Sequence, residues 1–172
     1  MRKSAAAARP KSSLDLAASH VMQKRIVTIS PTAPLSELER LLAEHRISGL
    51  PVTDSAGRAI GVVSYRDLLD HYADEPESRA RRGPGFFRLS TAHMEDEDFE
   101  SFEVPEESED TVADVMTPEV ISVKSDASIR EAARTMAEHT VHRVLVTDPE
   151  NGRVVGIVSS LDVLGAIAKG GD

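Results

Sequence analysis

The chain has 172 residues, enough for one large domain or two small ones, and 40% of its residues are hydrophobic although only 3% are aromatic. It contains no cysteine, which excludes disulfides, thiolate nucleophiles and zinc–thiolate sites. The net charge of −9 arises from acidic residues between Met94 and Thr111, so the rest of the chain is close to neutral and has no basic patch for binding nucleic acid.

The N-terminal residues 1–13 are predicted to be disordered. They begin with basic residues, but no apolar segment of the kind found in secretion signals follows. No apolar run in the chain approaches the roughly 18 residues that are needed to span a bilayer. We therefore expect a cytoplasmic protein without a membrane partner.

Residues 14–72 predict the order strand, helix, strand, strand, helix. The first helix begins near Thr32, whose hydroxyl is placed to cap free backbone N–H groups, and Pro34 lies in its first turn. Its apolar face consists of leucines at helical spacing, namely Leu35, Leu38, Leu41 and Leu42. The turn sequence Asp54-Ser55-Ala56-Gly57 favours a hairpin between the second and third strands. The predicted strands are Ile26–Ile29, Leu50–Thr53 and Ala59–Val63, and the last helix is Arg66–Tyr72.

The segment 73–110 separates this half of the chain from the next, and it is first basic and then acidic. Charge runs of this kind are typical of solvated linkers. The segment also contains all four phenylalanines of the chain, at positions Phe86, Phe87, Phe99 and Phe102. We therefore expect part of it to dock on a domain or on a partner.

Residues 111–170 repeat the pattern of residues 14–72. The tripeptides Ala43-Glu44-His45 and Val52-Thr53-Asp54 return as Ala137-Glu138-His139 and Val146-Thr147-Asp148. Asp126 is placed to cap the helix of this copy, whose apolar face is formed by Ile129, Ala132, Ala133, Met136 and Ala137. The predicted strands are Val120–Val123, Val144–Thr147 and Val154–Val158, and the last helix is Leu161–Ala168.

A shared heptapeptide closes both copies, as GVVSYRD from Gly61 and as GIVSSLD from Gly156. Ser64 and Ser159 follow a strand and stand at the start of a helix, where free N–H groups and partial positive charge suit a phosphate. Asp67 and Asp162 come one helical turn later and can accept hydrogen bonds from a ribose diol. Plain helix capping explains the same residues, and the two roles can coexist. The glycines allow a backbone or a ligand to approach closely.

The two copies resemble a tandem pair of CBS domains, the modules named after cystathionine β-synthase, also called a Bateman module. The resemblance rests on VADVMTPEV (Val112–Val120), HRVLVTD (His142–Asp148) and the closing heptapeptides. It implies an α/β (α+β) fold in which two β-α-β-β-α repeats pack about a pseudo-twofold axis and leave two clefts. The first copy departs from the pattern, with Gln23-Lys24 in place of Thr117-Pro118.

The resemblance also implies where a nucleotide base inserts, beside the first short strand of each repeat. The implied residues are Ile26, Val27 and Ile47 in the first copy, and Val120, Ile121 and Val141 in the second. Arg143, next to His142, is the candidate for a bidentate phosphate contact. Because Gly49 stands at the equivalent position of the first copy, we expect two sites of unequal affinity. Ordinary core packing of the apolar residues, and a surface role for Arg143, remain alternatives.

The function implied by the resemblance is a regulatory module that senses adenosyl-containing nucleotides and signals to a separate effector protein by reorienting its repeats. AMP, ADP and ATP are the candidate ligands, followed by S-adenosylmethionine and NAD, and no cofactor is obligatory. We expect a homodimer. The alternative is a structural homodimerisation or interaction module with vacant clefts. No enzyme activity and no metal site are expected, because only His139 and His142 have the spacing of a metal-binding pair and no nucleophile–base pair or phosphate-binding loop is visible.

Overall fold

The computed structural model describes residues 12–72, 85–88 and 109–169. Residues 1–11 of the predicted disordered N-terminus and most of the segment 73–110 therefore lie outside the described residues, whereas Ser13 begins a short 3-10 helix, Ser13–Asp15, where the sequence predicts disorder. The described helices are α1 (Leu35–His45), α2 (Tyr65–Tyr72), α3 (Gly85–Arg88), α5 (Val112–Val115), α6 (Ile129–His139) and α7 (Ser160–Lys169). The strands are β1 (Gly49–Thr53), β2 (Ala59–Ser64), β3 (Ser122–Lys124), β4 (Arg143–Thr147) and β5 (Val154–Ser159).

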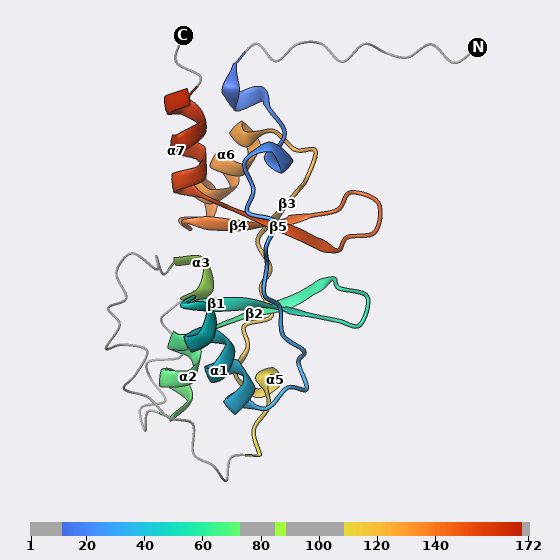
Figure 1. Cartoon of the computed structure of the whole chain (residues 1–172), viewed down its shortest axis with the longest axis vertical. Coiled ribbons are helices and arrows are strands. Elements are labelled where there is room, and N and C mark those ends of the chain that lie inside the picture. Colours follow the sequence, from blue (N-terminus) through green and yellow to red (C-terminus); the bar gives the residue numbers. More distant parts are fainter. Residues whose placement is uncertain (1–11, 73–84, 89–108, 170–172) are drawn as a thin grey trace, which may run out of the picture.

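Two small sheets lie face to face in the middle of the molecule, and the helices α1, α2, α6 and α7 cover their outer sides (Figure 1). In the first repeat β1 and β2 form an antiparallel hairpin, with Gly49 opposite Ser64. In the second, β4 and β5 form the same hairpin, with Arg143 opposite Ser159, and β3 runs parallel to β4. The predicted hairpins and the α+β fold of two similar repeats are confirmed.

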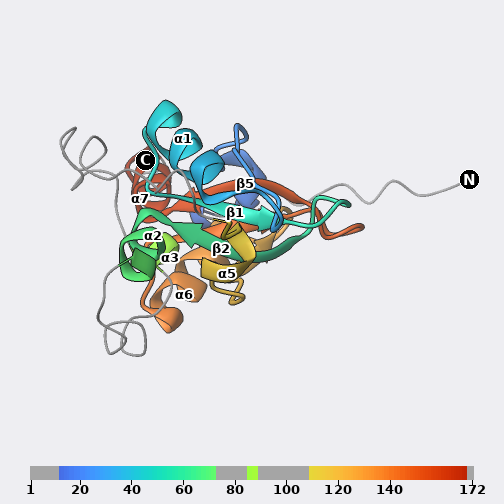
Figure 2. The ribbon, with the colours of Figure 1, turned by 90° about the horizontal axis from the view of Figure 1, so that it is seen from below.

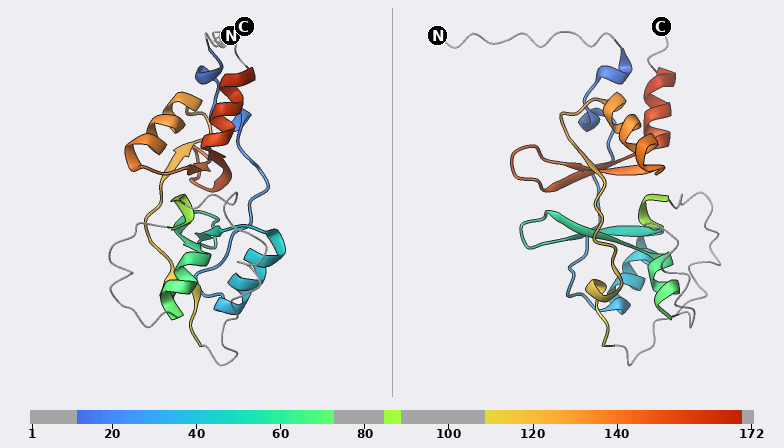
Figure 3. Two further views of the ribbon diagram at one scale, coloured as in Figure 1. Left: turned by 90° about the vertical axis from the view of Figure 1, so that its left-hand side faces the viewer. Right: turned by 180° about the vertical axis from the view of Figure 1, so that it is seen from behind.

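The segment that leads into each repeat packs on the other repeat. In the first repeat's leading segment the backbone of Gln23 exchanges two hydrogen bonds with Ile157 of β5. In the second repeat's leading segment, Thr117 does the same with Val62 of β2. Figure 3 shows both leading segments starting in the opposite half and running past the sheet of the other repeat into their own half. The two halves are therefore interlocked about a pseudo-twofold axis.

The hydrophobic core is divided between the two repeats in a way that reflects this exchange. One buried cluster combines α1, β1 and β2 residues with Val112 of the second leading segment. The other combines the second repeat with Ala18 of the first leading segment and with Phe86 and Phe87 of α3. Figure 2, a view from below, shows the two halves stacked with their helices spread on either side.

The first short strand of each copy is smaller than the sequence predicts. Residues 26–29 form no regular strand, and only Ile29 makes a single parallel bridge, to Val52. In the second copy the strand is confined to Ser122–Lys124. Ile26 and Val27, at the start of this stretch, line a cavity instead.

The predicted caps of α1 and α6 are wrong. Thr32 bonds to Ser30 instead, and the residue that precedes α1 is Pro34, which has no capping side chain. In the second copy Ser128, not Asp126, accepts the N–H of Glu131. Both α1 and α6 thus begin later in the sequence than caps at Thr32 and Asp126 would place them.

The apolar faces of α1 and α6 are largely as predicted, since Leu35, Leu38, Leu42, Ile129, Ala132 and Met136 are buried. Leu41 and Ala133 are half-buried, whereas Ala137, in the last turn of α6, is exposed. Both helices end at a residue in the left-handed conformation, Arg46 and Thr140, with φ of 50° and 54°.

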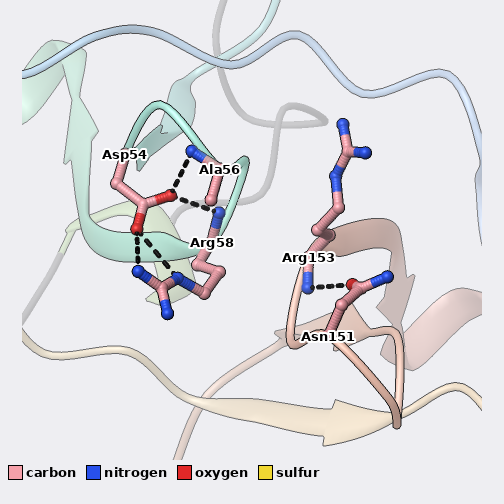
Figure 4. Close-up of polar contacts among 5 residues, drawn as sticks. All are labelled: Asp54, Ala56, Arg58, Asn151 and Arg153. Carbon is pink, nitrogen blue, oxygen red and sulfur yellow. Dashed lines mark hydrogen bonds and ion pairs between the residues drawn. The ribbon is translucent and has the colours of Figure 1, made fainter.

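The tips of the two hairpins meet across the pseudo-twofold axis, where the backbones of Arg58 and Arg153 form an isolated antiparallel β-bridge. In the first hairpin one oxygen of Asp54 accepts the N–H groups of Ala56 and Arg58, and the other accepts the Arg58 guanidinium at 2.8–2.9 Å (Figure 4). The second turn is one residue longer, and Asn151 accepts the N–H of Arg153 instead. This inserted residue is the main irregularity in the repeat.

Candidate functional site

The serine and aspartate of each closing heptapeptide bind each other at the start of the last helix. Asp67 accepts the N–H of Ser64 at 2.7 Å and its hydroxyl at 2.5 Å. Asp162 accepts the N–H of Ser159 at 2.8 Å and its hydroxyl at 2.6 Å. Both pairs thus cap a helix N-terminus, and in both the bonds reach only Oδ2 of the aspartate among the described residues. The second carboxylate oxygen of each pair is left for other partners.

The glycine that opens each heptapeptide makes room for the exchanged segment. A Cβ on Gly61 would lie 2.8 Å from the carbonyl oxygen of Thr117, and one on Gly156 would overlap the side chain of Met22. Close approach by another part of the chain therefore explains both glycines. The whole heptapeptide has a structural role, which does not depend on a ligand.

A cavity of about 560 Å³ opens beside one of the two Ser-Asp pairs, and we call it cleft 1. Its apolar wall comes from the first repeat, from Ile26, Val27 and Ile47. Its polar wall comes from the second repeat, from His142, Arg143, Ser159 and Asp162. The size is in the range of small-molecule sites, and the mixed lining combines an apolar slot with a helix N-terminus.

The electrostatic character of cleft 1 suits an anion at one end. Arg25 and Arg143 both line it, together with the first residues of α7. Burial lowers the pKa of Arg143, yet a guanidinium still keeps its charge at neutral pH. Asp162 is the acid of the cleft, and its Ser159 contacts hold it in place.

The equivalent positions in the other half, which we call cleft 2, are Val120, Ile121, Val141, Ser64, Asp67 and Gly49 by the internal repeat. Of these six residues only Gly49 also lines cleft 1. The structure therefore separates the twelve predicted site residues into one group at cleft 1 and another at cleft 2. In cleft 2, Ser64 is fully buried and Ile121 and Val141 are 6% exposed. Burial raises the pKa of Asp67, against its hydrogen bonds from Ser64.

Several residues of cleft 1 are not among those that the sequence predicts as site residues. They are Gln23, Arg25, Gly49, Pro51, Phe86, Ile157, Ser160 and Leu161. Gln23 and Arg25 lie within three residues of the predicted Ile26, so their closeness in sequence was the signal that could have identified them as site residues. Phe86 comes from the distant segment 73–110, for which the repeat has no counterpart.

The chain belongs to the CBS domain family. The family model for the CBS domain matches residues 18–74 and 112–169, which together make up more than half of the chain. Both copies of the repeat are thereby accounted for, and the predicted tandem pair is confirmed.

Two curated relatives come from Methanocaldococcus jannaschii. The uncharacterized protein MJ1426 is 30% identical over 152 residues, which cover 86% of this chain and 88% of that protein. Inosine-5'-monophosphate dehydrogenase is 26% identical over 147 residues, which cover 86% of this chain but only 23% of the enzyme. The chain thus spans less than a quarter of that relative, although it spans most of MJ1426.

Solved CBS pairs share the fold of this chain. The structure of CBSX2 in complex with AMP matches with a TM-score of 0.62 at 23% identity, covering 90% of this chain and 97% of that one. The CBS domain pair of MJ0100, in complex with 5'-methylthioadenosine and S-adenosyl-L-methionine, matches with a TM-score of 0.59 at 21% identity, covering 89% and 96%. Both structures hold ligands that contain adenosine.

The described part of the chain has neither a membrane-spanning helix nor a cluster of metal-binding side chains. No helix there is long and apolar enough to cross a membrane. No group of three or more His, Asp or Glu side chains in residues 12–72, 85–88 and 109–169 is arranged to hold a metal ion.

Proposed function

We propose that this CBS pair is a regulatory module that binds an adenosyl-containing nucleotide in cleft 1 and signals its occupancy to a separate effector protein. The observation that carries the proposal is the composition of cleft 1. An apolar slot and Arg25 from one repeat, and a helix N-terminus with an acid and Arg143 from the other, converge on one cavity. Ligand-binding regulatory modules are typical of the family, which supports the assignment.

Each part of an adenine nucleotide has a matching wall in cleft 1. The base fits between Val27 and Ile47, and the ribose diol faces the Asp162 carboxylate, whose Oδ1 accepts no bond from the described residues. The phosphates face Arg143 and the α7 N-terminus, a pairing that is favourable for anions. AMP, ADP and ATP fit this arrangement, and S-adenosylmethionine and NAD share the adenosine that the first two walls recognise.

The coupling to an effector follows from where cleft 1 lies. Its walls belong to different repeats, so any change in the relative orientation of the repeats alters the contacts of a bound ligand. The ligand therefore favours the orientation in which its contacts are best. No catalytic role is proposed, because the Ser159 hydroxyl and the Asp162 carboxylate of cleft 1 are engaged in the cap of α7.

A thermal-shift panel tests the proposal, with AMP, ADP, ATP, S-adenosylmethionine and NAD on the purified protein. A ligand at about 100 times its Kd stabilises by roughly 2.7 kcal/mol, which is a measurable shift in Tm. We expect a shift with at least one adenosine ligand and its loss in Asp162→Ala. The absence of a shift with every ligand, repeated by calorimetry, would refute the proposal.

A homodimer is the second part of the proposal, and the surface of α7 supports it. Leu161, Leu164 and Ile167 are 69%, 57% and 47% exposed, which is unusual for three large apolar residues on one short helix. A Cβ on Gly165 would meet nothing within 4 Å, so the helix surface is open there. A second copy of the chain would cover this surface.

Sedimentation analysis tests the dimer. We expect the wild type to sediment as a dimer and Leu164→Asp to sediment as a monomer, with Asn151→Asp in the exposed hairpin turn as the charge-matched control. If all three sediment as monomers, the dimer is wrong. If the dimer forms while every adenosine ligand fails to shift Tm, the alternative of a structural dimerisation module with vacant clefts is favoured.

A further inference from the structure

We propose that cleft 2 is filled by the chain's own residues Phe86 and Phe87, so that the pair binds one nucleotide per chain. The inference deepens the proposed function and rests on it for the ligand of cleft 1. It concerns α3, a single helical turn from the segment between the repeats that lies against β1, β2, β4 and α2. Figure 1 shows α3 (green) between the two sheets, at the side where α2 and α7 begin.

The two phenylalanines are core residues rather than surface residues. Phe86 is 1% exposed and Phe87 is fully buried, and their rings meet edge to face with centroids 4.9 Å apart. They share one buried cluster with Val62, Ile121 and Val141. Ile121 and Val141 are the residues that the CBS resemblance implies for a base in cleft 2, so the rings belong to the same apolar core as the implied base site.

The difference in burial between equivalent positions shows where the aromatic rings are placed. Ile121 and Val141 are buried, whereas their counterparts Val27 and Ile47 in cleft 1 are half-buried. Ser64 is likewise buried, whereas Ser159 is half-buried. Each pair has the same or a similar side chain, so the difference in burial comes from the surroundings, and α3 is a described element near Ser64 that the internal repeat does not duplicate.

Gly49 makes the fit possible. A Cβ at this position would lie 2.7 Å from the carbonyl oxygen of Val63 and 2.9 Å from Cδ2 of Phe86, so glycine leaves room both for the neighbouring strand and for the ring. Its counterpart in the second repeat is Arg143, the candidate phosphate ligand. The first repeat thus lacks the phosphate-binding side chain at the position where it must admit an aromatic ring.

The backbone of α3 is also tied to cleft 1. The carbonyl of Phe87 accepts the N–H of His142 at 2.9 Å, and the carbonyl of His142 accepts the N–H of Ser160 at the start of α7 at 2.9 Å. Phe86 itself lines cleft 1 next to Arg143. α3 therefore blocks one cleft and forms part of the wall of the other.

The main test is the stoichiometry of AMP binding by calorimetry. We expect one AMP per chain in the wild type, lost in Asp162→Ala and unchanged in the matched variant Asp67→Ala. In the double variant Phe86→Ala/Phe87→Ala we expect a second, weaker site, which the further change Asp67→Ala removes. Two AMP per wild-type chain would overturn the inference.

A second measurement covers the case in which the double variant does not fold or the wild type binds no AMP. The chain has only four phenylalanines and no tryptophan, so incorporation of 4-fluorophenylalanine gives four fluorine signals. We expect two of them, assigned by Phe86→Leu and Phe87→Leu, to be shielded from a soluble paramagnetic quencher with and without AMP. Quenching of both signals would disprove the placement of α3 whatever the nucleotide result, whereas shielded signals without AMP binding would refute only the proposed function.

Discussion

The guanidinium carbon of Arg143 lies 5.5 Å from the centroid of the Phe86 ring. This cation–π contact joins a residue of cleft 1 to the helix that fills cleft 2. A contact of this kind contributes about 0.5–1 kcal/mol, or more where water is excluded. It contributes to restricting the conformations of this arginine before a ligand binds.

Phe86→Leu is therefore expected to weaken the binding of AMP in cleft 1 by about two- to five-fold, as the loss of about 0.5–1 kcal/mol implies. The substituted side chain is still apolar and fills most of the space. Phe87→Leu, which removes a ring that no cation of the described residues covers, is the matched control. Calorimetry measures both, and equal losses in the two variants would contradict a positioning role for Phe86.

The two serines provide a matched pair that separates capping from ligand binding. Ser64→Ala and Ser159→Ala each remove a hydroxyl that donates to an aspartate at 2.5–2.6 Å, so each is expected to lower the free energy of unfolding by about 1 kcal/mol. Only Ser159→Ala is expected to reduce the AMP-dependent shift in Tm as well. A reduced shift in Ser64→Ala of the same size would indicate that cleft 2 also binds the ligand.

The pH dependence of stability is expected to change when Asp67 is replaced. Burial raises the pKa of Asp67 in the folded state, so the folded protein holds a proton more tightly than the unfolded chain does. Stability from this group is thus present at low pH and lost as pH rises through the raised pKa. Asp67→Asn removes this loss, so the variant should gain stability relative to the wild type from acid to neutral pH.

Urea unfolding of Asp67→Asn and the wild type over this pH range measures the difference. Asp162→Asn, in which the same two bonds from serine are altered, controls for the change of cap. If the free energy of unfolding of Asp67→Asn falls relative to that of the wild type as pH rises, then the pKa of Asp67 is lowered in the folded state and not raised.

The glycines of the heptapeptides predict unequal costs of substitution. In Gly61→Ala the new Cβ would lie 2.8 Å from the backbone oxygen of Thr117, which cannot move alone. In Gly156→Ala it would overlap Met22, whose flexible side chain can rotate away. We expect Gly61→Ala to cost about 1–3 kcal/mol and Gly156→Ala less, as measured by urea unfolding. The reverse order would contradict the exchange of leading segments at these positions.

Much of the fold was predictable because both copies carry the same local signals. Repeated turn sequences indicated the hairpins, and the spacing of Leu35, Leu38 and Leu42 indicated the buried face of α1. The caps were not predictable, because Thr32 has a local partner in Ser30 that competes with the helix end.

The site was predictable only in part, because its geometry depends on long-range contacts. The sequence indicated that Ser159 and Asp162 stand at one helix end, and it implied a base site at Ile26 and Val27, but not that the two would face one cavity across the repeats. The place of Phe86 had no local signal beyond the concentration of phenylalanine in its segment. Such contacts are set by the packing of the whole chain.

The exchange of leading segments makes the two repeats thermodynamically inseparable. Ala18 is buried in the core of the second repeat and Val112 in that of the first, so a cut between the repeats would strip each half of part of its own interior. The pair should unfold in a single cooperative transition rather than repeat by repeat. Duplication of the unit therefore produced one domain with two halves, in which a change in either half is transmitted to the other through shared core residues.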